Sequence, residues 1–220
     1  MITFRDITFA ISDTSDVSEI FPFIAWMIFS RKGLPYSILG IYFLISGTVK
    51  IFTLVTAELR INNMPAYHLL SFLEIATVYS FYSMLTLKKI NPWVITALFC
   101  LYAANSIFIQ PVFTFNSLSW TTSMVLIVVI GMVYFYQIYK REEDTTSLGE
   151  RPDFIITAAW LIYASGSLFT YLMGTDILSG NPDGFFKNAW IFQCISNILK
   201  NMIICYGFWL TSRACQKLPI

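Results

Sequence analysis

The sequence predicts an all-α membrane protein, a bundle of seven transmembrane helices, and three observations lead to this fold class. Of the 220 residues, 56% are hydrophobic and only 12% are charged, whereas a typical soluble domain is about 45–50% apolar and about 25% charged. Seven apolar runs alternate with short polar loops, and most runs reach the roughly 20 residues that cross a bilayer. Aromatic residues flank the fifth run, as they do at membrane interfaces. We therefore expect a multi-pass protein of a cell membrane, with a bacterial inner membrane as the expected location.

The predicted helices follow the apolar runs in order. They cover residues 17–30, 34–57, 64–86, 92–113, 118–139, 154–174 and 187–212. Pro65 and Pro92 stand in the first turns of the third and fourth helices, a position that suits proline. In the sixth helix, the small residues from Ala164 to Ser167 predict close approach of a neighbouring helix.

The first predicted helix is the shortest. It covers about 21 Å, less than the roughly 30 Å of a hydrocarbon core. Acidic residues open it and Arg31 and Lys32 close it, which favours a spanning helix whose acidic start lies in a solvated vestibule. A re-entrant or interfacial helix is the alternative.

Basic residues in the loops predict the orientation of the bundle. One side of the predicted membrane carries Arg5, Arg60 and Lys187. The other carries Arg31, Lys32, Lys88, Lys89, Lys140, Arg141, Arg151, Arg213 and Lys217. The second side is expected to be cytoplasmic, which places the N-terminus outside and the C-terminus inside. The longest loop, Lys140–Asp153, is too short for a folded domain, so we expect residues 1–220 to form one membrane domain.

The seventh predicted helix carries a polar stripe. At 100° per residue, Gln193, Asn197, Lys200 and Asn201 fall with Trp190 inside an arc of roughly 100°. A charged side chain near the bilayer centre costs about 2.5–3.5 kcal/mol on insertion scales. The stripe is therefore expected to face the interior of the protein. A purely structural role as interhelical hydrogen bonds is the alternative for its amides.

Other polar residues lie at similar depth in the predicted helices. Lys50, Glu74, Asn105 and Lys200 fall within roughly 9 Å of depth when counted at 1.5 Å per residue. A buried carboxylate needs a partner, so we expect Glu74 to pair with Lys50 or with Lys200. Lys50 is also close enough to the interface to reach water with its ammonium group.

These residues predict a polar pocket in the outer half of the bundle. Its expected lining is His68, Glu74, Asn105, Trp160, Tyr163, Trp190, Gln193, Asn197, Lys200 and Asn201. The leading hypothesis is a receptor-like protein that binds a small polar or anionic ligand and signals through a cytoplasmic or membrane protein partner. The alternative is a transporter or channel for small solutes or ions.

Several function classes are disfavoured by what the sequence contains. A net charge of +1 and scattered basic residues argue against a nucleic-acid partner. His68 is the single histidine and no cysteine cluster accompanies it, so no metal site is expected. No Ser/His/Asp, Cys/His or paired-carboxylate arrangement predicts an enzyme.

One layout resembles that of microbial rhodopsins. In that family a lysine in the seventh helix carries retinal as a Schiff base and a carboxylate in the third helix is its counter-ion, positions that Lys200 and Glu74 match. Trp160 and Tyr163 are similar to an aromatic pair of the family's sixth helix. The resemblance implies retinal on Lys200, and no other cofactor is expected. The sequence departs from the family at Ala164, where a proline is usual, at Ser196, where pumps carry an aspartate, and at Val78, where Thr or Ser is expected.

Three short motifs lie in the third, sixth and seventh predicted helices. They are Phe72-Leu73-Glu74 in the third predicted helix, W-x-x-Y-x-S-G from Trp160 to Gly166, and N-x-x-K-N from Asn197 to Asn201. In these motifs the chain resembles small bacterial seven-helix integral membrane proteins of uncharacterised function.

Overall fold

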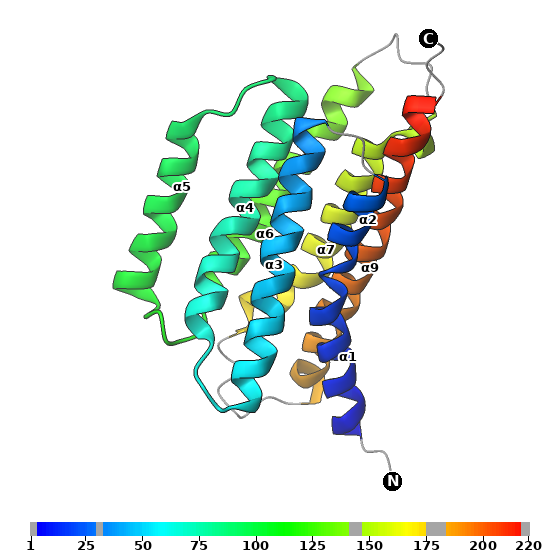
Figure 1. Cartoon of the computed structure of the whole chain (residues 1–220). Helices are drawn as coiled ribbons and strands as arrows, with labels where there is room; N and C mark the ends of the chain where they lie inside the picture. The colour runs from blue at the N-terminus through cyan, green and yellow to red at the C-terminus, as the bar shows by residue number, and fades with distance from the viewer. Residues whose placement is uncertain (1–3, 30–32, 141–146, 175–183, 217–220) are drawn as a thin grey trace.

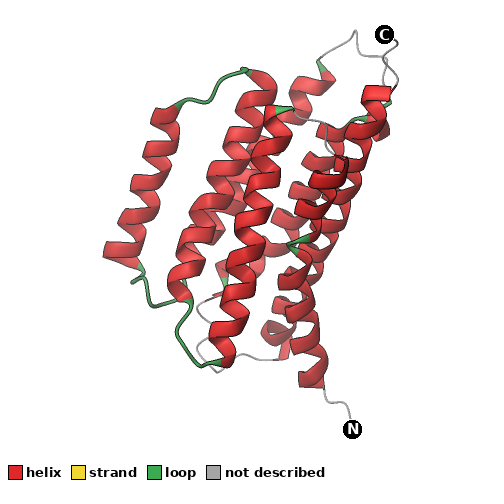
Figure 2. Ribbon diagram, viewed as in Figure 1, coloured by secondary structure: helices red, strands yellow, loops and turns green. Residues whose placement is uncertain are grey.

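The computed structural model describes residues 4–29, 33–140, 147–174 and 184–216, and these ranges form a helical bundle without strands (Figures 1 and 2). Six helices are long and apolar enough to cross a membrane. They are α3 (Leu34–Glu58), α4 (Met64–Thr86), α5 (Pro92–Ala104) with the π-helical turn η1 (Asn105–Ile109), α6 (Ser117–Tyr139), α7 (Pro152–Leu172) and α9 (Gly184–Gln216). A short 3₁₀ turn, η2 (Leu148–Glu150), precedes α7. The prediction of a multi-pass, all-α membrane protein is therefore confirmed.

The helix ends follow the chemistry of the flanking residues. α4 has the predicted bounds, and α3, α6 and α7 differ from prediction by two residues or fewer at each end. Proline occupies the first turn of α3, α4, α5 and α7, where its missing N–H leaves no helical bond unmade. The Asn91 side chain caps α5 by accepting a hydrogen bond from the backbone N–H of Trp93 at 3.0 Å. Local sequence thus determines where these helices begin.

The predicted first helix, 17–30, is wrong in its bounds. The structure has two helices, α1 (Phe4–Ser18) and α2 (Phe21–Phe29), joined by a turn at Glu19 and Ile20. Pro22 explains the break, because it has no N–H for the carbonyl of Ser18 and its ring would clash with that carbonyl. Figure 1 shows α1 and α2 following one another along the bundle, so α1 begins at the end opposite to the one where α9 finishes. A seventh membrane crossing by α1 and α2 stays a prediction.

The fourth predicted helix, 92–113, ends earlier than expected. Its π-helical turn stops at Ile109, with the N–H of Gln110 donating to the carbonyl of Asn105 at 2.8 Å. Pro111 disfavours a helical conformation at the residue before it, which explains this end. α5 stands at the edge of the bundle (Figure 1), and Pro92–Phe99 contains no buried residue.

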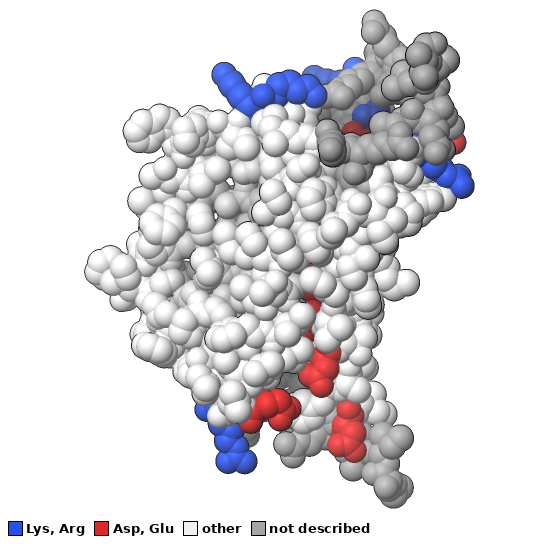
Figure 3. Space-filling view, in the orientation of Figure 1, with Lys and Arg blue, Asp and Glu red and all other residues white. Residues whose placement is uncertain are grey.

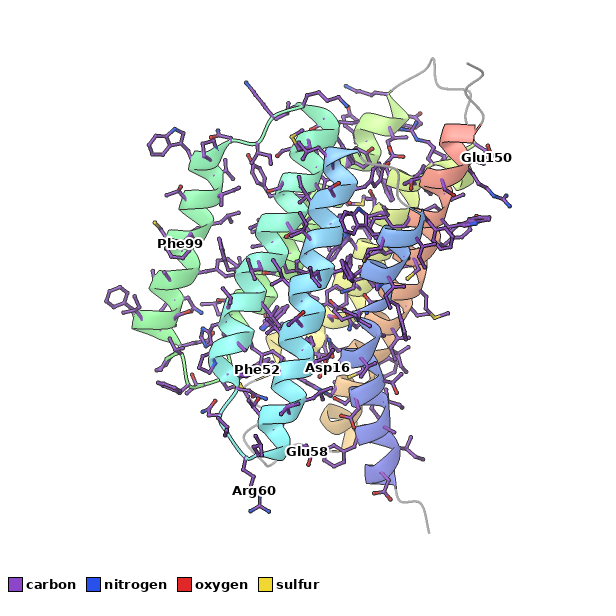
Figure 4. All side chains as sticks on the ribbon, viewed as in Figure 1. Asp16, Phe52, Glu58, Arg60, Phe99 and Glu150 are labelled. Carbon is purple, nitrogen blue, oxygen red and sulfur yellow. The ribbon has the colours of Figure 1, made fainter. Side chains whose placement is uncertain are left out.

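Charged residues gather at the two ends of the bundle and leave a nearly uncharged band between them (Figure 3). Arg60 lies at the lower end in Figure 4, together with Glu58. The described basic residues at the opposite end are Lys88, Lys89, Lys140, Arg151 and Arg213. This asymmetry agrees with the loop pattern of the sequence, whose cytoplasmic assignment rests on the positive-inside rule.

α7 and α9 approach one another closely at Gly166. A Cβ atom added there would overlap the Oγ of Ser196 and lie 2.9 Å from its Cβ. The absence of a side chain at this position therefore permits the contact, as the small-residue segment of the sixth predicted helix indicated.

Candidate functional site

Five charged side chains converge inside the bundle, and we call them the buried charge cluster. They are Asp16 of α1, Glu19 of the turn between α1 and α2, Lys50 of α3, Glu74 of α4 and Lys200 of α9. Glu19, Glu74 and Lys200 are 3%, 2% and 1% exposed. Charged groups so deeply buried in a membrane protein are costly to maintain and mark a candidate site.

Lys200 forms the centre of the cluster. Its Nζ donates to Oε1 and Oε2 of Glu19 at 3.1 and 3.4 Å. The same ammonium group lies 4.4 Å from the ring centroid of Tyr163 and 5.0 Å from that of Trp160, within reach of cation–π attraction. The ring of Phe43 is at 5.6 Å. One carboxylate and three aromatic faces therefore surround the amino group of Lys200.

The carboxylate of Glu19 accepts further hydrogen bonds. Asn201 donates to its Oε2 at 2.7 Å and Ser46 donates to its Oε1 at 3.2 Å. Donors from α3 and α9 thus meet at a residue of the α1–α2 turn. A buried ion pair is tolerated when its remaining lone pairs are satisfied in this way.

The polar stripe of α9 faces this turn and the end of α1. Asn197 donates to Oγ of Ser15 at 3.0 Å, and Asn201 donates to Oγ of Ser18 at 2.8 Å. Gln193 donates to the hydroxyl of Tyr171 on α7 at 3.1 Å. All the stripe residues except half-buried Trp190 are buried. The stripe therefore attaches the N-terminal helix to the bundle through polar contacts.

Lys50 pairs with Asp16. Its Nζ lies 2.8 Å from Oδ1 of Asp16, and the two side chains are 15% and 14% exposed. Figure 4 shows Asp16 between α1 and α3, where this pair joins the two helices. The ammonium group also lies 4.9 Å from the ring centroid of Tyr67.

The expected pairing of Glu74 with Lys50 or Lys200 is wrong. Within the described ranges the ion pairs of the lysines are with Asp16 and Glu19, and none includes Glu74. Two acidic residues of the N-terminal segment occupy the lysines because α1 and α2 pack against α9 and α3. Glu74 keeps one hydrogen bond, from the hydroxyl of Tyr42 to its Oε2 at 3.4 Å. Its Oε1 is buried and has no partner among the described residues.

A small enclosed cavity borders Glu74. Its volume is about 10 Å³, the room that one water molecule needs. Trp120 also lines it, and the indole Nε1 of Trp120 is a buried donor without a described partner. The remaining lining residues are Glu19, Tyr42, Ser46, Lys50, Leu70, Tyr163, Tyr171, Gln193 and Asn197. A residue with an unpaired acceptor and a residue with an unpaired donor thus both line a space of about one water.

Two predicted pocket residues belong to a different polar network. His68 contacts Oγ of Ser106 at 2.7 Å through Nδ1 and the carbonyl of Thr114 at 3.0 Å through Nε2. Asn105 donates to Oγ of Ser119 at 2.9 Å. These contacts join α4, η1 and the start of α6, so the two residues do not line the cavity beside Glu74.

The predicted aromatic residues divide in the same way. Trp160 and Tyr163 surround Lys200. Trp190 packs edge-to-face with Phe115, with ring centroids 6.2 Å apart. The predicted ligand-binding role of these residues stays a prediction.

Sequence reasoning missed the partners that the N-terminal segment contributes. Ser15, Ser18 and Glu19 recur at spacings of three and four residues and therefore share one helical face. Because the predicted helix began at residue 17, its acidic start was assigned to a solvated vestibule. The helical spacing of Ser15 and Ser18 was the signal that could have placed this face against the stripe of α9.

We expect no visible absorption band when all-trans retinal is added to the purified protein. The Lys200 amine is bonded to Glu19 and surrounded by three rings, and the adjoining cavity admits about one water. These contacts oppose attack on a retinal aldehyde and leave little room for the polyene. An absorption spectrum checks this, and a band that disappears in Lys200→Arg would contradict it.

Comparisons with known protein families, with curated proteins and with solved structures gave no match. The buried charge cluster therefore supplies the basis for a functional proposal.

Proposed function

We propose that this protein is an integral membrane transporter of protons, or of a small solute coupled to protons, and that Glu74 is its proton-binding group. The observation that supports the proposal is the buried, unpaired carboxyl group of Glu74 beside a cavity of about 10 Å³. Ionisable residues inside membrane bundles characterise proton relays and ion pathways. We place the protein in a bacterial inner membrane, with its lysine-rich end in the cytoplasm.

Charge balance favours a proton at this position. The cluster has three carboxyl groups and two ammonium groups, which leaves one negative charge when all five are ionised. A proton on Glu74 makes the cluster neutral, and its loss restores a charge that is unfavourable in a low-dielectric interior. Glu74 can therefore exchange a proton without breaking either ion pair.

The size of the cavity favours a proton over an organic ligand. Pockets for drug-sized molecules measure about 300–1,000 Å³, far above the 10 Å³ beside Glu74. Two lysine ammonium groups close by also oppose a metal cation. Glu74 and Trp120, which carry an unpaired acceptor and an unpaired donor, both line this cavity of about one water.

Replacing Glu74 with Gln should reduce proton flux in proteoliposomes at least about tenfold, because removal of a general acid or base commonly costs about 10²–10⁴-fold in proton transfer. The flux is driven by a potassium gradient with valinomycin and measured with an enclosed pH-sensitive dye. Glu58→Gln is the matched control, because Glu58 is exposed at the end of α3. We expect the control to keep wild-type flux.

Two outcomes would contradict this proposal. Absence of proton flux in the wild-type protein, with and without candidate small solutes, would show that the protein is not a proton transporter. Undiminished proton flux in the Glu74→Gln variant would show that Glu74 is not the proton-binding group.

A receptor for a small polar or anionic ligand is the second candidate, and the attachment of α1 favours it. α1 and the α1–α2 turn meet α9 through polar contacts of Ser15, Ser18 and Glu19. Separation of these groups would free Lys200 and Lys50 for an anion. A receptor would show saturable ligand binding and a co-purifying partner without flux, which distinguishes it from the transporter.

A further inference from the structure

A groove between α4 and α6 lies away from the buried charge cluster. Its volume is about 210 Å³, and its lining runs from Tyr79 to Thr86 near the end of α4 and from Val129 to Gln137 near the end of α6. Val129, Ile130 and Val133 form its apolar wall, and Val129 and Val133 are 52% and 51% exposed. The remaining lining residues are Tyr79, Tyr82, Ser83, Thr86, Tyr134 and Gln137. The groove therefore opens toward the bilayer.

The groove contains polar groups that the bundle does not satisfy. The side chains of Tyr79, Ser83 and Gln137 line it, and no hydrogen bond joins them to another part of the described chain. Their positions in the last turns place them near one face of the membrane. A ligand with oxygen acceptors beside an apolar tail would match this combination.

Three exposed lysines stand just beyond the groove. Lys88 and Lys89 follow Thr86, the last residue of α4, and Lys140 follows α6 three residues after Gln137. At 1.5 Å per residue, the step from Gln137 to Lys140, the C-cap of α6, corresponds to about 5 Å along the helix axis. Lys140 also lies 4.7 Å from the ring centroid of Tyr136. The end of the groove is thus positively charged.

The acidic side chain of Asp153, at the start of α7, is already engaged. Asp153 accepts hydrogen bonds from Tyr134, a groove residue, and from Arg151 at 3.0 Å. The three lysines make no ion pair with a described residue. Within the described ranges their ammonium groups therefore have no acidic partner.

α5 does not block lipid from the end of the bundle where the groove lies. The segment Pro92–Phe99 has no buried residue, and Trp93 is 79% exposed. α5 contacts α4 further down, where Phe72 packs against Phe99 and Tyr102 at centroid distances of 5.5 and 6.2 Å. Lipid can therefore reach the bundle beside the upper half of α5.

We propose that the groove between α4 and α6 is a binding site for one anionic phospholipid. Its acyl chain lies along Val129, Ile130 and Val133, its ester oxygens meet Ser83 and Gln137, and its phosphate is bound by Lys88, Lys89 and Lys140. Basic sites between membrane helices recognise anionic head groups in this way, each Lys or Arg near the surface contributing about 1 kcal/mol. The site is independent of the proposed transport function.

Native mass spectrometry of the purified full-length protein tests the proposal. The protein is mixed with equal amounts of phosphatidylglycerol and phosphatidylcholine that carry identical acyl chains. We expect at least about fivefold more bound phosphatidylglycerol, because three lysines at about 1 kcal/mol each allow this preference. The variant Lys88→Gln/Lys89→Gln/Lys140→Gln should reduce the preference to twofold or less.

A matched control and a second variant keep the test decisive. Arg60→Gln/Arg213→Gln removes positive charge at both ends of the bundle but outside the groove, and should keep the preference. Val133→Trp fills the groove and should lower the retention of both lipids, while size-exclusion chromatography verifies that each variant is folded. Equal retention of the two lipids by the wild type, an unchanged preference in the triple lysine variant, or a lipid-free dimer formed through this face would overturn the proposal.

Discussion

Replacing Lys200 with Met should lower the free energy of unfolding by about 3–5 kcal/mol, the usual cost of removing one partner of a buried ion pair. Glu19 would keep hydrogen bonds from Asn201 and Ser46, but its charge would remain buried without compensation. Methionine nearly preserves the volume between the rings of Trp160 and Tyr163, so lost packing contributes little. Equilibrium unfolding in mixed micelles with increasing SDS measures the change.

A double-mutant cycle separates the ion pair from other effects of the substitution. Glu19→Gln/Lys200→Met should recover most of the lost stability, because no unpaired charge remains. Lys50→Met should cost less than Lys200→Met, since the side chain of Asp16 is 14% exposed and can reach water. A Lys200→Met variant as stable as the wild type would show that Glu19 is solvated or protonated.

Replacing Gly166 with Val should destabilise the bundle by about 1–3 kcal/mol through overpacking. An added Cβ would overlap Oγ of Ser196, and both residues lie on helices that pack along their lengths. α7 and α9 would have to move apart, which weakens the packing that stabilises membrane helix pairs. The same unfolding assay in SDS measures the loss.

The control for this prediction is another glycine. A Cβ atom at Gly149 would meet nothing within 4 Å, so Gly149→Val should change the stability by less than about 0.5 kcal/mol. Combining Gly166→Ala with Ser196→Gly should restore stability relative to Gly166→Ala alone. Absence of this rescue would mean that the close approach at Gly166 does not limit the packing.

Local chemistry made most of the helices predictable. Apolar runs of membrane length predict the membrane helices of the bundle. Pro65 and Pro92 determine where α4 and α5 begin. The break after Ser18 was predictable in principle, since Pro22 removes the hydrogen bond at that point. What misled the prediction was hydropathy, because the acidic start of the first predicted helix was expected in a solvated vestibule, although the bundle buries Glu19.

The composition of the charge cluster was only partly predictable. Helical spacing and the cost of a membrane-embedded lysine correctly indicated that Lys200 must face protein. Its partner did not follow, because the expected pairing with Glu74 relied on similar depth in the predicted helices, whereas Glu19 lies outside them in the turn between α1 and α2, 181 residues away along the chain. Which side chains meet depends on the rotation and order of packed helices, and single-sequence periodicity does not specify these.

The separation between Glu19 and Lys200 also has a consequence for biogenesis. During synthesis Glu19 enters the membrane region long before the ribosome has made α9, so its lysine partner is missing until the last helix is inserted. The N-terminal segment can reach its final position only at the end of translation, when α9 supplies Lys200, Asn197 and Asn201 together. A chain truncated before α9 would therefore leave the carboxylate of Glu19 without its lysine and asparagine partners.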